Sequence, residues 1–230
     1  MSKQSSGVSL LLFVLSPLVG FLSTFRDITS RASGFIFVTF YTLFGYFHTF
    51  EDIRSDSYRK AIDFETGSLG SLSDVWRDYM NGDITDIYEK LLYHILHLFT
   101  RDPHILMAVV GMIGGYFVWK TISRVLQDWN SEESNLPICT IVLMLFLCFN
   151  PVMIGGVRNF TAVAIFSYST LRFLVDRRSW WVVGLLLSPL IHFGFVVSAA
   201  AVIFARFVRL PNKFLLYLFI PIAIFSTFFT

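Results

Sequence analysis

Six long stretches of the chain contain no Lys, Arg, Asp or Glu: residues 8–25, 32–50, 105–119, 136–157, 179–205 and 214–230. A helix needs roughly 20 apolar residues to cross about 30 Å of hydrocarbon. In lipid every backbone polar group has to be paired internally, which favours helices. Residues 8–25 lack a small-x-small cleavage site, so we expect a retained span rather than a signal peptide. With one more helix after Arg158, the pattern predicts an all-α, polytopic transmembrane helix bundle of about seven spans.

Residues 86–100 show a different, amphipathic pattern. The apolar residues there fall at helical spacing, and the charged and histidine side chains occupy other faces. The apolar set is Ile87, Leu91, Leu92, Ile95, Leu96 and Phe99. Because the segment is too short and too polar to span comfortably, we expect an interfacial or re-entrant helix.

Composition supports a membrane location. Hydrophobic residues make up 55% of the chain and charged residues 15%, against about 25% charged in a soluble domain. Residues 51–102 hold eleven acidic and six basic side chains, and the rest of the chain is basic. Cytoplasmic loops are richer in Lys and Arg. We therefore expect one transmembrane domain over residues 1–230, with residues 51–104 as an acidic, extracytoplasmic segment.

Several partner classes have no support in the sequence. No dense basic patch points to nucleic acid, and no nucleotide-binding, metalloprotease or nucleophile-elbow motif is present. The expected partner is the lipid bilayer, with no cofactor and no metal. His94 and His97 have the spacing of a zinc pair but lack further ligands. Gly111 and Gly115 are spaced for close helix approach, either within the chain or in a dimer.

The polar residues inside apolar stretches are the candidates for chemistry. Arg158 follows the break at Asn150-Pro151 and the pair Gly155-Gly156. An Arg near the bilayer centre costs roughly 2.5–3.5 kcal/mol on insertion scales, so it needs water, a partner or an anionic ligand such as a diphosphate. The alternative is that Arg158 extends to the interface and binds nothing specific.

His192 lies within the run 179–205, just after Pro189. Its imidazole would serve as a general base, a proton relay or a packing residue. The segment Asp56-Ser57-Tyr58-Arg59 follows the second run, and would either bind sugar hydroxyls or form a self-paired loop.

Four short elements in a fixed order resemble the EpsG family of bacterial exopolysaccharide proteins, which are similar to Wzy-type polymerases. These elements are Asp56-Ser57-Tyr58-Arg59, Asp86-Ile87-Tyr88, Asn150-Pro151 with Arg158-Asn159, and His192. Asn159 stands where the family commonly has Gln, and Phe193-Gly194-Phe195 replaces its small hydroxyl residue. Family members are also longer, and the run 214–230 ends without polar flanking residues, so we expect a truncated member.

The resemblance implies a protein of the bacterial inner membrane that polymerises polyprenyl-diphosphate-linked oligosaccharides for exopolysaccharide, capsule or O-antigen. It assigns catalysis to Arg158 and His192. Substrate binding falls to Asp56, Tyr58, Arg59, Tyr88, Asn150 and Asn159, and a chain-length regulator is a further expected partner. The alternatives are a flippase or transporter for lipid-linked sugars, a non-catalytic membrane subunit of the same pathway, and an acyltransferase.

Overall fold

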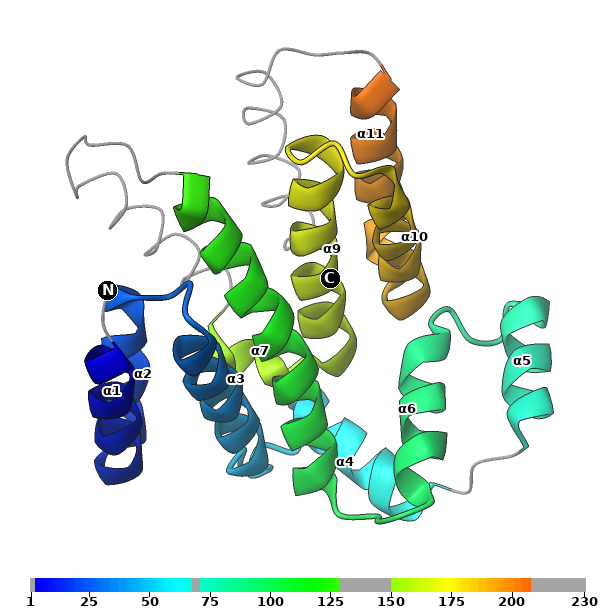
Figure 1. Ribbon diagram of the computed structural model, residues 1–230. Coiled ribbons are helices and arrows are strands. Elements are labelled where there is room, and N and C mark those ends of the chain that lie inside the picture. The colour runs from blue at the N-terminus through cyan, green and yellow to red at the C-terminus, as the bar shows by residue number, and fades with distance from the viewer. Residues whose placement is uncertain (1–2, 68–70, 129–149, 208–230) are drawn as a thin grey trace.

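The computed structural model describes residues 3–67, 71–128 and 150–207, and all regular secondary structure in these residues is helical (Figure 1). The predicted all-α class is therefore confirmed. The longer helices are α1 (Lys3–Leu15), α2 (Pro17–Ser23), α3 (Arg31–Tyr46), α4 (Asp56–Thr66), α5 (Leu72–Asn81), α6 (Ile87–His97), α7 (Pro103–Asp128), α9 (Val157–Leu174), α10 (Val182–Ile191) and α11 (Val196–Phe207). Short 3₁₀ turns are η1 (Thr24–Arg26), η2 (Pro151–Gly155), η3 (Ser179–Trp181) and η4 (Phe193–Phe195).

Helix α7 is the centre of the fold and packs between α3 and α9 (Figure 1). The approach is close because glycines line both contacts. A Cβ at Gly111 would lie 2.3 Å from the carbonyl oxygen of Tyr41 on α3, and one at Gly114 would lie 2.1 Å from the ring of Phe160 on α9. The rings of Tyr41 and Phe160 in turn stack with centroids 6.0 Å apart. The glycines at 111 and 114 therefore serve packing within the chain.

The predicted single span over residues 8–25 is wrong, because this run forms two helices. Ser16 has extended backbone (φ −152°, ψ 102°) and Pro17 opens α2, so the helix breaks between them. The two short helices lie side by side, and a Cβ at Gly20 of α2 would touch the backbone of Phe13 in α1.

The predicted single span over residues 179–205 is also wrong, and the run folds back on itself. Pro189 interrupts the hydrogen bonding near the end of α10 and His192 is extended (φ −149°, ψ 115°). After η4, α11 returns to the end where α10 began: Nη2 of Arg206 donates to the carbonyl oxygen of Arg177 at 3.3 Å. The two helices are roughly 15 and 18 Å long at 1.5 Å per residue, which is too short to cross a bilayer.

One helix in the described part of the chain, α7, is long and apolar enough to cross a membrane, over Pro103–Leu126. Its 26 residues extend roughly 39 Å. Helices α3 and α9 pack along it with 16 and 18 residues. The predicted span over residues 214–230, and residues 136–149 of another, lie outside the described residues.

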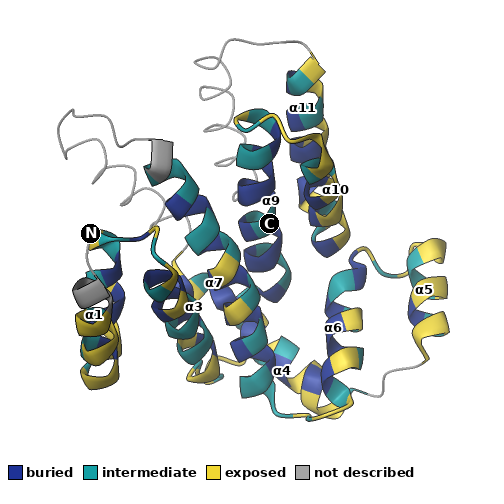
Figure 2. Cartoon of the chain, viewed as in Figure 1, coloured by how far each residue is buried: buried dark blue, intermediate teal, exposed yellow. Residues whose placement is uncertain are grey.

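The acidic segment folds into three short helices at one end of the bundle. Ser55 caps α4, and Ser71 with Asp74 forms a capping box on α5. The amphipathic helix expected within residues 86–100 is confirmed as α6. Leu92 and Leu96 are buried, whereas Ile95 and, just after the helix, Phe99 are exposed. Figure 2 shows α6 with both buried and exposed positions.

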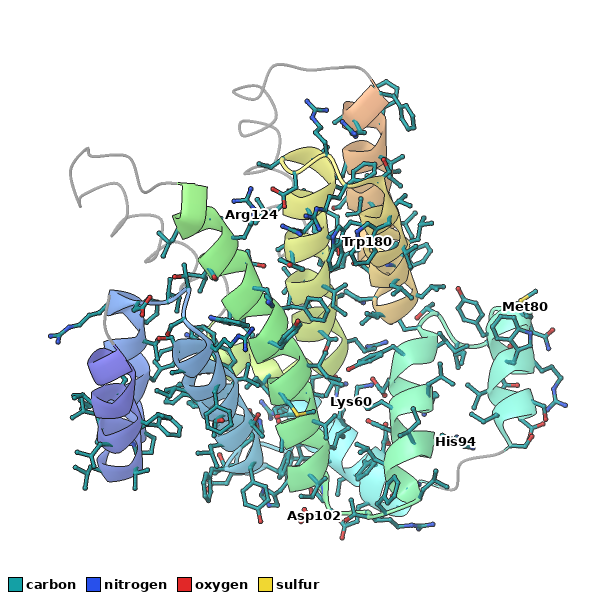
Figure 3. The ribbon with its side chains drawn as sticks, in the orientation of Figure 1. Lys60, Met80, His94, Asp102, Arg124 and Trp180 are labelled. Atoms are coloured by element: carbon teal, nitrogen blue, oxygen red, sulfur yellow. The ribbon has the colours of Figure 1, made fainter. Side chains whose placement is uncertain are left out.

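A compact ion cluster lies at the opposite end of α7 and α9, where Figure 3 labels Arg124. Arg124 of α7 and Arg172 of α9 both bind the carboxylate of Asp176. Nε of Arg124 lies 2.9 Å from Oδ1 of that carboxylate. The pKa of Asp176 is held below its usual range, because hydrogen bonds and charge from the two guanidinium groups outweigh the effect of burial.

Candidate functional site

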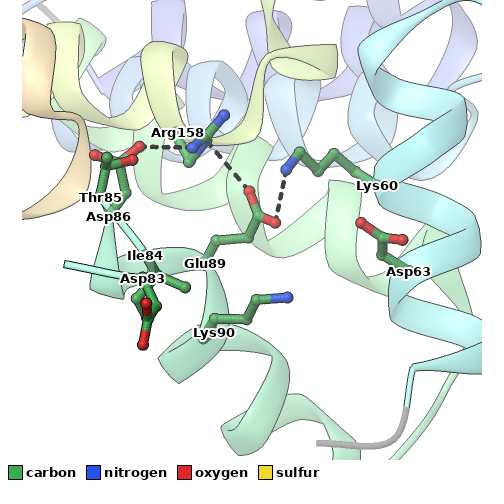
Figure 4. A pocket seen from close by; sticks show the side chains of 9 residues that line it. All are labelled: Lys60, Asp63, Asp83, Ile84, Thr85, Asp86, Glu89, Lys90 and Arg158. Atoms are coloured by element: carbon green, nitrogen blue, oxygen red, sulfur yellow. Dashed lines mark hydrogen bonds and ion pairs between the residues drawn. The ribbon is translucent and has the colours of Figure 1, made fainter. Parts of the chain in front are cut away.

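Four charged side chains from three separate segments form a chain of ion pairs (Figure 4). Nζ of Lys60 on α4 lies 2.8 Å from Oε1 of Glu89 on α6. Nε of Arg158 on α9 lies 3.3 Å from Oε2 of Glu89, and its Nη1 lies 2.6 Å from Oδ2 of Asp86. Asp86 and Glu89 are almost fully buried, whereas about a third of the Arg158 side chain (32%) stays exposed.

Asp86 connects this chain of ion pairs to the turn between α10 and α11. Its Oδ1 accepts a 2.7 Å hydrogen bond from the backbone N–H of Phe193. Its Oδ2 lies 3.6 Å from Nδ1 of His192. Burial alone would favour the neutral carboxyl, but the His192 ring, the Phe193 N–H and the Arg158 charge outweigh it. Together they hold the pKa of Asp86 below its usual range.

Local backbone structure explains why these groups meet. Asp86 occupies the N-cap position of α6 in extended conformation, yet its side chain makes no capping bond to its own helix and is available to its neighbours. Arg158 stands in the first turn of α9, just after Gly156. The start of α9 lies beside the middle of α7, because Ile154 contacts the Gly111 position and Phe160 contacts the Gly114 position.

The ion pairs border a cavity of about 240 Å³ between α4, α6 and the start of α9 (Figure 4). Eight of the nine lining residues are polar or charged, and they include three cationic and four acidic side chains, for a formal charge of −1. The lining residues are Lys60, Asp63, Asp83, Ile84, Thr85, Asp86, Glu89, Lys90 and Arg158.

The structure brings the two predicted catalytic residues to one carboxylate. Arg158 lines the cavity, and His192 lies behind Asp86 with about a fifth of its side chain (18%) exposed. Both ring nitrogens of His192 are buried and make no hydrogen bond to a described residue. The arrangement therefore combines a guanidinium that faces a cavity with an imidazole beside a carboxylate, which is the pairing that commonly orients a general base.

None of the six predicted substrate-binding residues lines the cavity, including the three that belong to α6, η2 and α9 or adjoin them. The hydroxyl of Tyr88 lies 3.3 Å from that of Thr161 on α9, and burial raises the pKa of Tyr88 to about 12. Asn150 is exposed and its side chain accepts from the N–H of Val152, which caps η2. Asn159 is half-buried next to Arg158.

The segment Asp56–Arg59 forms the first turn of α4, where Arg59 pairs with Asp56 at 3.4 Å on an exposed surface. None of Asp56, Tyr58 and Arg59 lines the cavity. Their arrangement agrees with a self-paired surface turn, and the cationic residue that α4 contributes to the cavity is Lys60.

Sequence reasoning missed Lys60, treated Glu89 only as a weak candidate beside Tyr88, and gave Asp86 no role of its own. Lys60 and Glu89 lie 29 positions apart, and Asp86 and Arg158 lie 72 apart. The spacing of Asp86 and Glu89, three residues apart on α6, was the one local signal that both could face a single partner.

His97, one of the two histidines with the spacing of a zinc pair, packs against α4. Nε2 of His97 lies 2.7 Å from the carbonyl oxygen of Phe64, and its ring contacts that of Phe64. Over residues 3–67, 71–128 and 150–207, no group of three His, Cys, Asp or Glu side chains is placed to hold a metal ion.

A second, apolar groove of about 450 Å³ opens on the far side of α3. It is lined by the second half of α3 and the residues that follow it, together with one residue each of α2 and η2: Pro17, Phe40, Leu43, Phe44, Phe47, His48, Thr49 and Val152. The His48 ring and Ser57 of α4 both border the Gly155 position. The groove suits an apolar chain better than a sugar.

The chain matches no protein-family model, no curated protein and no solved structure. The resemblance to EpsG-type proteins therefore depends on the order of its short motifs. The physical argument for function depends on the cavity and on the ion pairs around Asp86.

Proposed function

We propose that the chain is a multi-pass protein of the bacterial inner membrane that transfers saccharide units between polyprenyl-diphosphate carriers. The observation that carries the proposal is the position of Arg158. Its partly exposed guanidinium faces a polar cavity, level with the middle of the one described helix that meets the length and composition of a span. A cation at that depth is rare and commonly functional.

In the proposed reaction a hydroxyl at the non-reducing end of one glycan attacks the anomeric carbon of another. The new C–O bond forms as the bond between that carbon and the diphosphate breaks, and the diphosphate leaves with the electron pair. Arg158 stabilises the negative charge on the leaving group. His192 is assigned the proton of the attacking hydroxyl, which requires its ring to turn toward the cavity, because both ring nitrogens are buried behind Asp86 in this structure. Asp86 orients the imidazole and stabilises its charged form.

A second candidate function is favoured by one observation. The charge of Arg158 is already balanced inside the chain by Asp86 and Glu89. A non-catalytic membrane subunit would use these ion pairs only to join α6, α9 and the turn at His192. The two functions differ in what they demand of residue 158, because a structural ion pair tolerates Lys better than a bidentate phosphate site does.

The test is to replace Arg158 with Ala or Lys in cells and to analyse the lipid-linked glycans. The proposal predicts loss of polymer and accumulation of single lipid-linked repeats in both variants, with the protein still inserted at wild-type levels. The matched control is Arg77→Ala, which removes an exposed Arg paired with Asp74 on α5. Polymer of normal length in both Arg158 variants would reject the catalytic assignment.

A further inference from the structure

Helices α10 and α11 form a hairpin whose outer face is apolar and exposed. The two helices lie side by side next to α9 (Figure 1), and each is long enough to reach across roughly half of a 30 Å hydrocarbon layer. The run that forms them, residues 179–205, contains no charged side chain. An uncharged face of this extent suits the acyl chains of lipids. Its exposed apolar side chains are Val183, Leu186, Leu187, Leu190, Val196, Val197 and Phe204.

The tip of the hairpin is held by the protein. Asp86 accepts a 2.7 Å hydrogen bond from the backbone N–H of Phe193, which joins the tip to the start of α6. Non-helical backbone at membrane depth persists only where the protein or water satisfies its polar groups. The tip therefore meets the condition for a turn inside a bilayer.

The two ends of the hairpin meet at its base. Nη2 of Arg206 donates to the carbonyl oxygen of Arg177 at 3.3 Å, and the Arg206 guanidinium lies 5.7 Å from the ring centroid of Phe173 on α9. An uncharged run that crossed a bilayer would have its ends about 30 Å apart. Both ends of this run instead lie at one end of the molecule, opposite the acidic helices α4 to α6.

The hairpin base, which we define as residues 172–178 and Arg206, carries surplus positive charge. It includes four guanidinium groups and one carboxylate, that of Asp176. This carboxylate is shared by Arg172 of the base and Arg124 of α7. The other three guanidinium groups of the base have no carboxylate partner in the described part of the chain.

The hairpin base also has the side chains typical of a membrane surface. Arg177 and Arg178 are both exposed, and Arg177 has a φ of 58°, a conformation that favours glycine. Trp180 follows directly, 59% exposed, with its ring 4.1 Å from that of Trp181. Trp is enriched at the level of lipid headgroups, and the planar guanidinium group suits phosphate oxygens.

We propose that the hairpin base binds the phosphate groups of anionic phospholipids in the cytoplasmic leaflet, and that α10 and α11 enter and leave the membrane there as a re-entrant hairpin. Cytoplasmic ends of membrane proteins are enriched in Lys and Arg. If residues 179–205 crossed the membrane, Arg206 would lie on the side opposite Arg177 and Arg178; the re-entrant hairpin places all three on the cytoplasmic side. The inference depends on the membrane location that the proposed function includes, and is independent of the proposed reaction.

Cysteine labelling in spheroplasts tests the topology. Cys139 and Cys148 are first replaced with Ser in the full chain. Single substitutions then add one thiol each at three exposed positions: Ser179→Cys and Phe207→Cys at the two ends of the hairpin, and Glu65→Cys at the acidic end. A membrane-impermeant maleimide should label position 65 in intact spheroplasts, and positions 179 and 207 only after the membrane is permeabilised.

Native mass spectrometry tests the lipid surface. The full chain is delipidated in detergent and titrated with equal amounts of phosphatidylglycerol and phosphatidylcholine, and the wild type should prefer phosphatidylglycerol. The double variant Arg177→Gln, Arg178→Gln should lower this preference roughly tenfold, because each Arg near an anionic surface adds to the attraction. The matched control Arg54→Gln, Arg77→Gln removes two exposed guanidinium groups from the acidic end and should leave the preference unchanged.

Labelling of positions 179 and 207 from opposite sides would overturn the re-entrant hairpin, and labelling of both in intact spheroplasts would overturn the assigned side. An unchanged lipid preference in the Arg177, Arg178 variant, or an equal loss in the control, would overturn the lipid surface. Inorganic phosphate that displaces the lipid in the same spectra would overturn it in favour of a site for free phosphate. None of these measurements involves polymer, so failure here remains distinguishable from failure of the proposed reaction, which the Arg158 variants test separately.

Discussion

The carboxylate of Asp86 accepts a 2.7 Å hydrogen bond from the backbone N–H of Phe193, a residue 107 positions further along the chain. Phe193 lies at the turn where α10 ends and α11 begins to return. A backbone N–H at such a turn has no helical partner, and inside a bilayer it could not be satisfied by lipid. Asp86 thus fixes the turn and is the common neighbour of His192 and Arg158.

Replacing Asp86 with Ala should destabilise the protein. The Phe193 N–H loses its acceptor and Arg158 loses one of its two carboxylate partners. Hydrogen bonds to charged groups contribute about 1.5–3 kcal/mol each, and we expect a loss of unfolding free energy in that range. Denaturant unfolding in detergent measures it. Asp83→Ala is the control, because Asp83 is exposed and should change stability by less than about 0.5 kcal/mol.

The contribution of Asp86 should depend on pH. Its pKa is below the usual range in the folded protein, so the unfolded chain binds a proton more readily than the folded one. The stabilisation is therefore complete above the ordinary Asp value of about 3.9 and is lost as the pH falls through that value toward the lower, folded pKa. The stability difference between wild type and Asp86→Asn should shrink over that interval. If the stability difference between wild type and Asp86→Asn grew on acidification, the pKa of Asp86 would not be lowered in the folded protein.

Substitution of Gly111 by Ala should separate α7 from α3. The added Cβ would lie 2.3 Å from the backbone carbonyl oxygen of Tyr41, which cannot move without shifting its helix. Overpacking of this kind costs about 1–3 kcal/mol. Gly7→Ala is the control, since nothing lies within 4 Å of a Cβ there. That change should be neutral or stabilising by up to about 1 kcal/mol, because Ala favours helix. Thermal unfolding of both variants provides the comparison.

Loss of the Asp176 carboxylate should weaken the opposite end of the bundle. Asp176→Asn deprives Arg124 and Arg172 of the counterion they share, and removal of one partner of a buried pair costs about 3–5 kcal/mol. We expect the lower end of that range, because the two Arg side chains keep 19% and 17% exposure. The exposed Asp56→Asn should cost less than about 1 kcal/mol. Equal melting temperatures for the two variants would contradict this account.

The sequence predicted individual helices well. It predicted the arrangement of these helices in space only in part. The spacing of Leu92 and Leu96 correctly indicated α6, and the glycines near residue 111 correctly indicated close helix packing. Hydropathy could not show that the runs around Ser16 and His192 fold back, because a turn inside an apolar run leaves the composition unchanged.

The candidate site was also predicted only in part from the sequence. Arg158 was recognisable because a cation is conspicuous in an apolar stretch. Lys60 and Glu89 were not, since a Lys and a Glu are ordinary in an acidic, polar segment, and their pairing depends on how α4 meets α6. The anionic partners of Arg158 proved to include two carboxylates of the chain itself.

The central claim is that Arg158 acts on a substrate and does more than hold Asp86. The most direct test is Arg158→Lys, which keeps a cation beside Asp86 and Glu89 and leaves Asp86 and His192 unchanged. Because the two carboxylates keep a cationic partner, the melting temperature should stay near that of the wild type, whereas the paired N–H donors of the guanidinium are lost. With the fold preserved, we predict that cells make no polymer and accumulate single lipid-linked repeats; polymer of wild-type length would contradict the account.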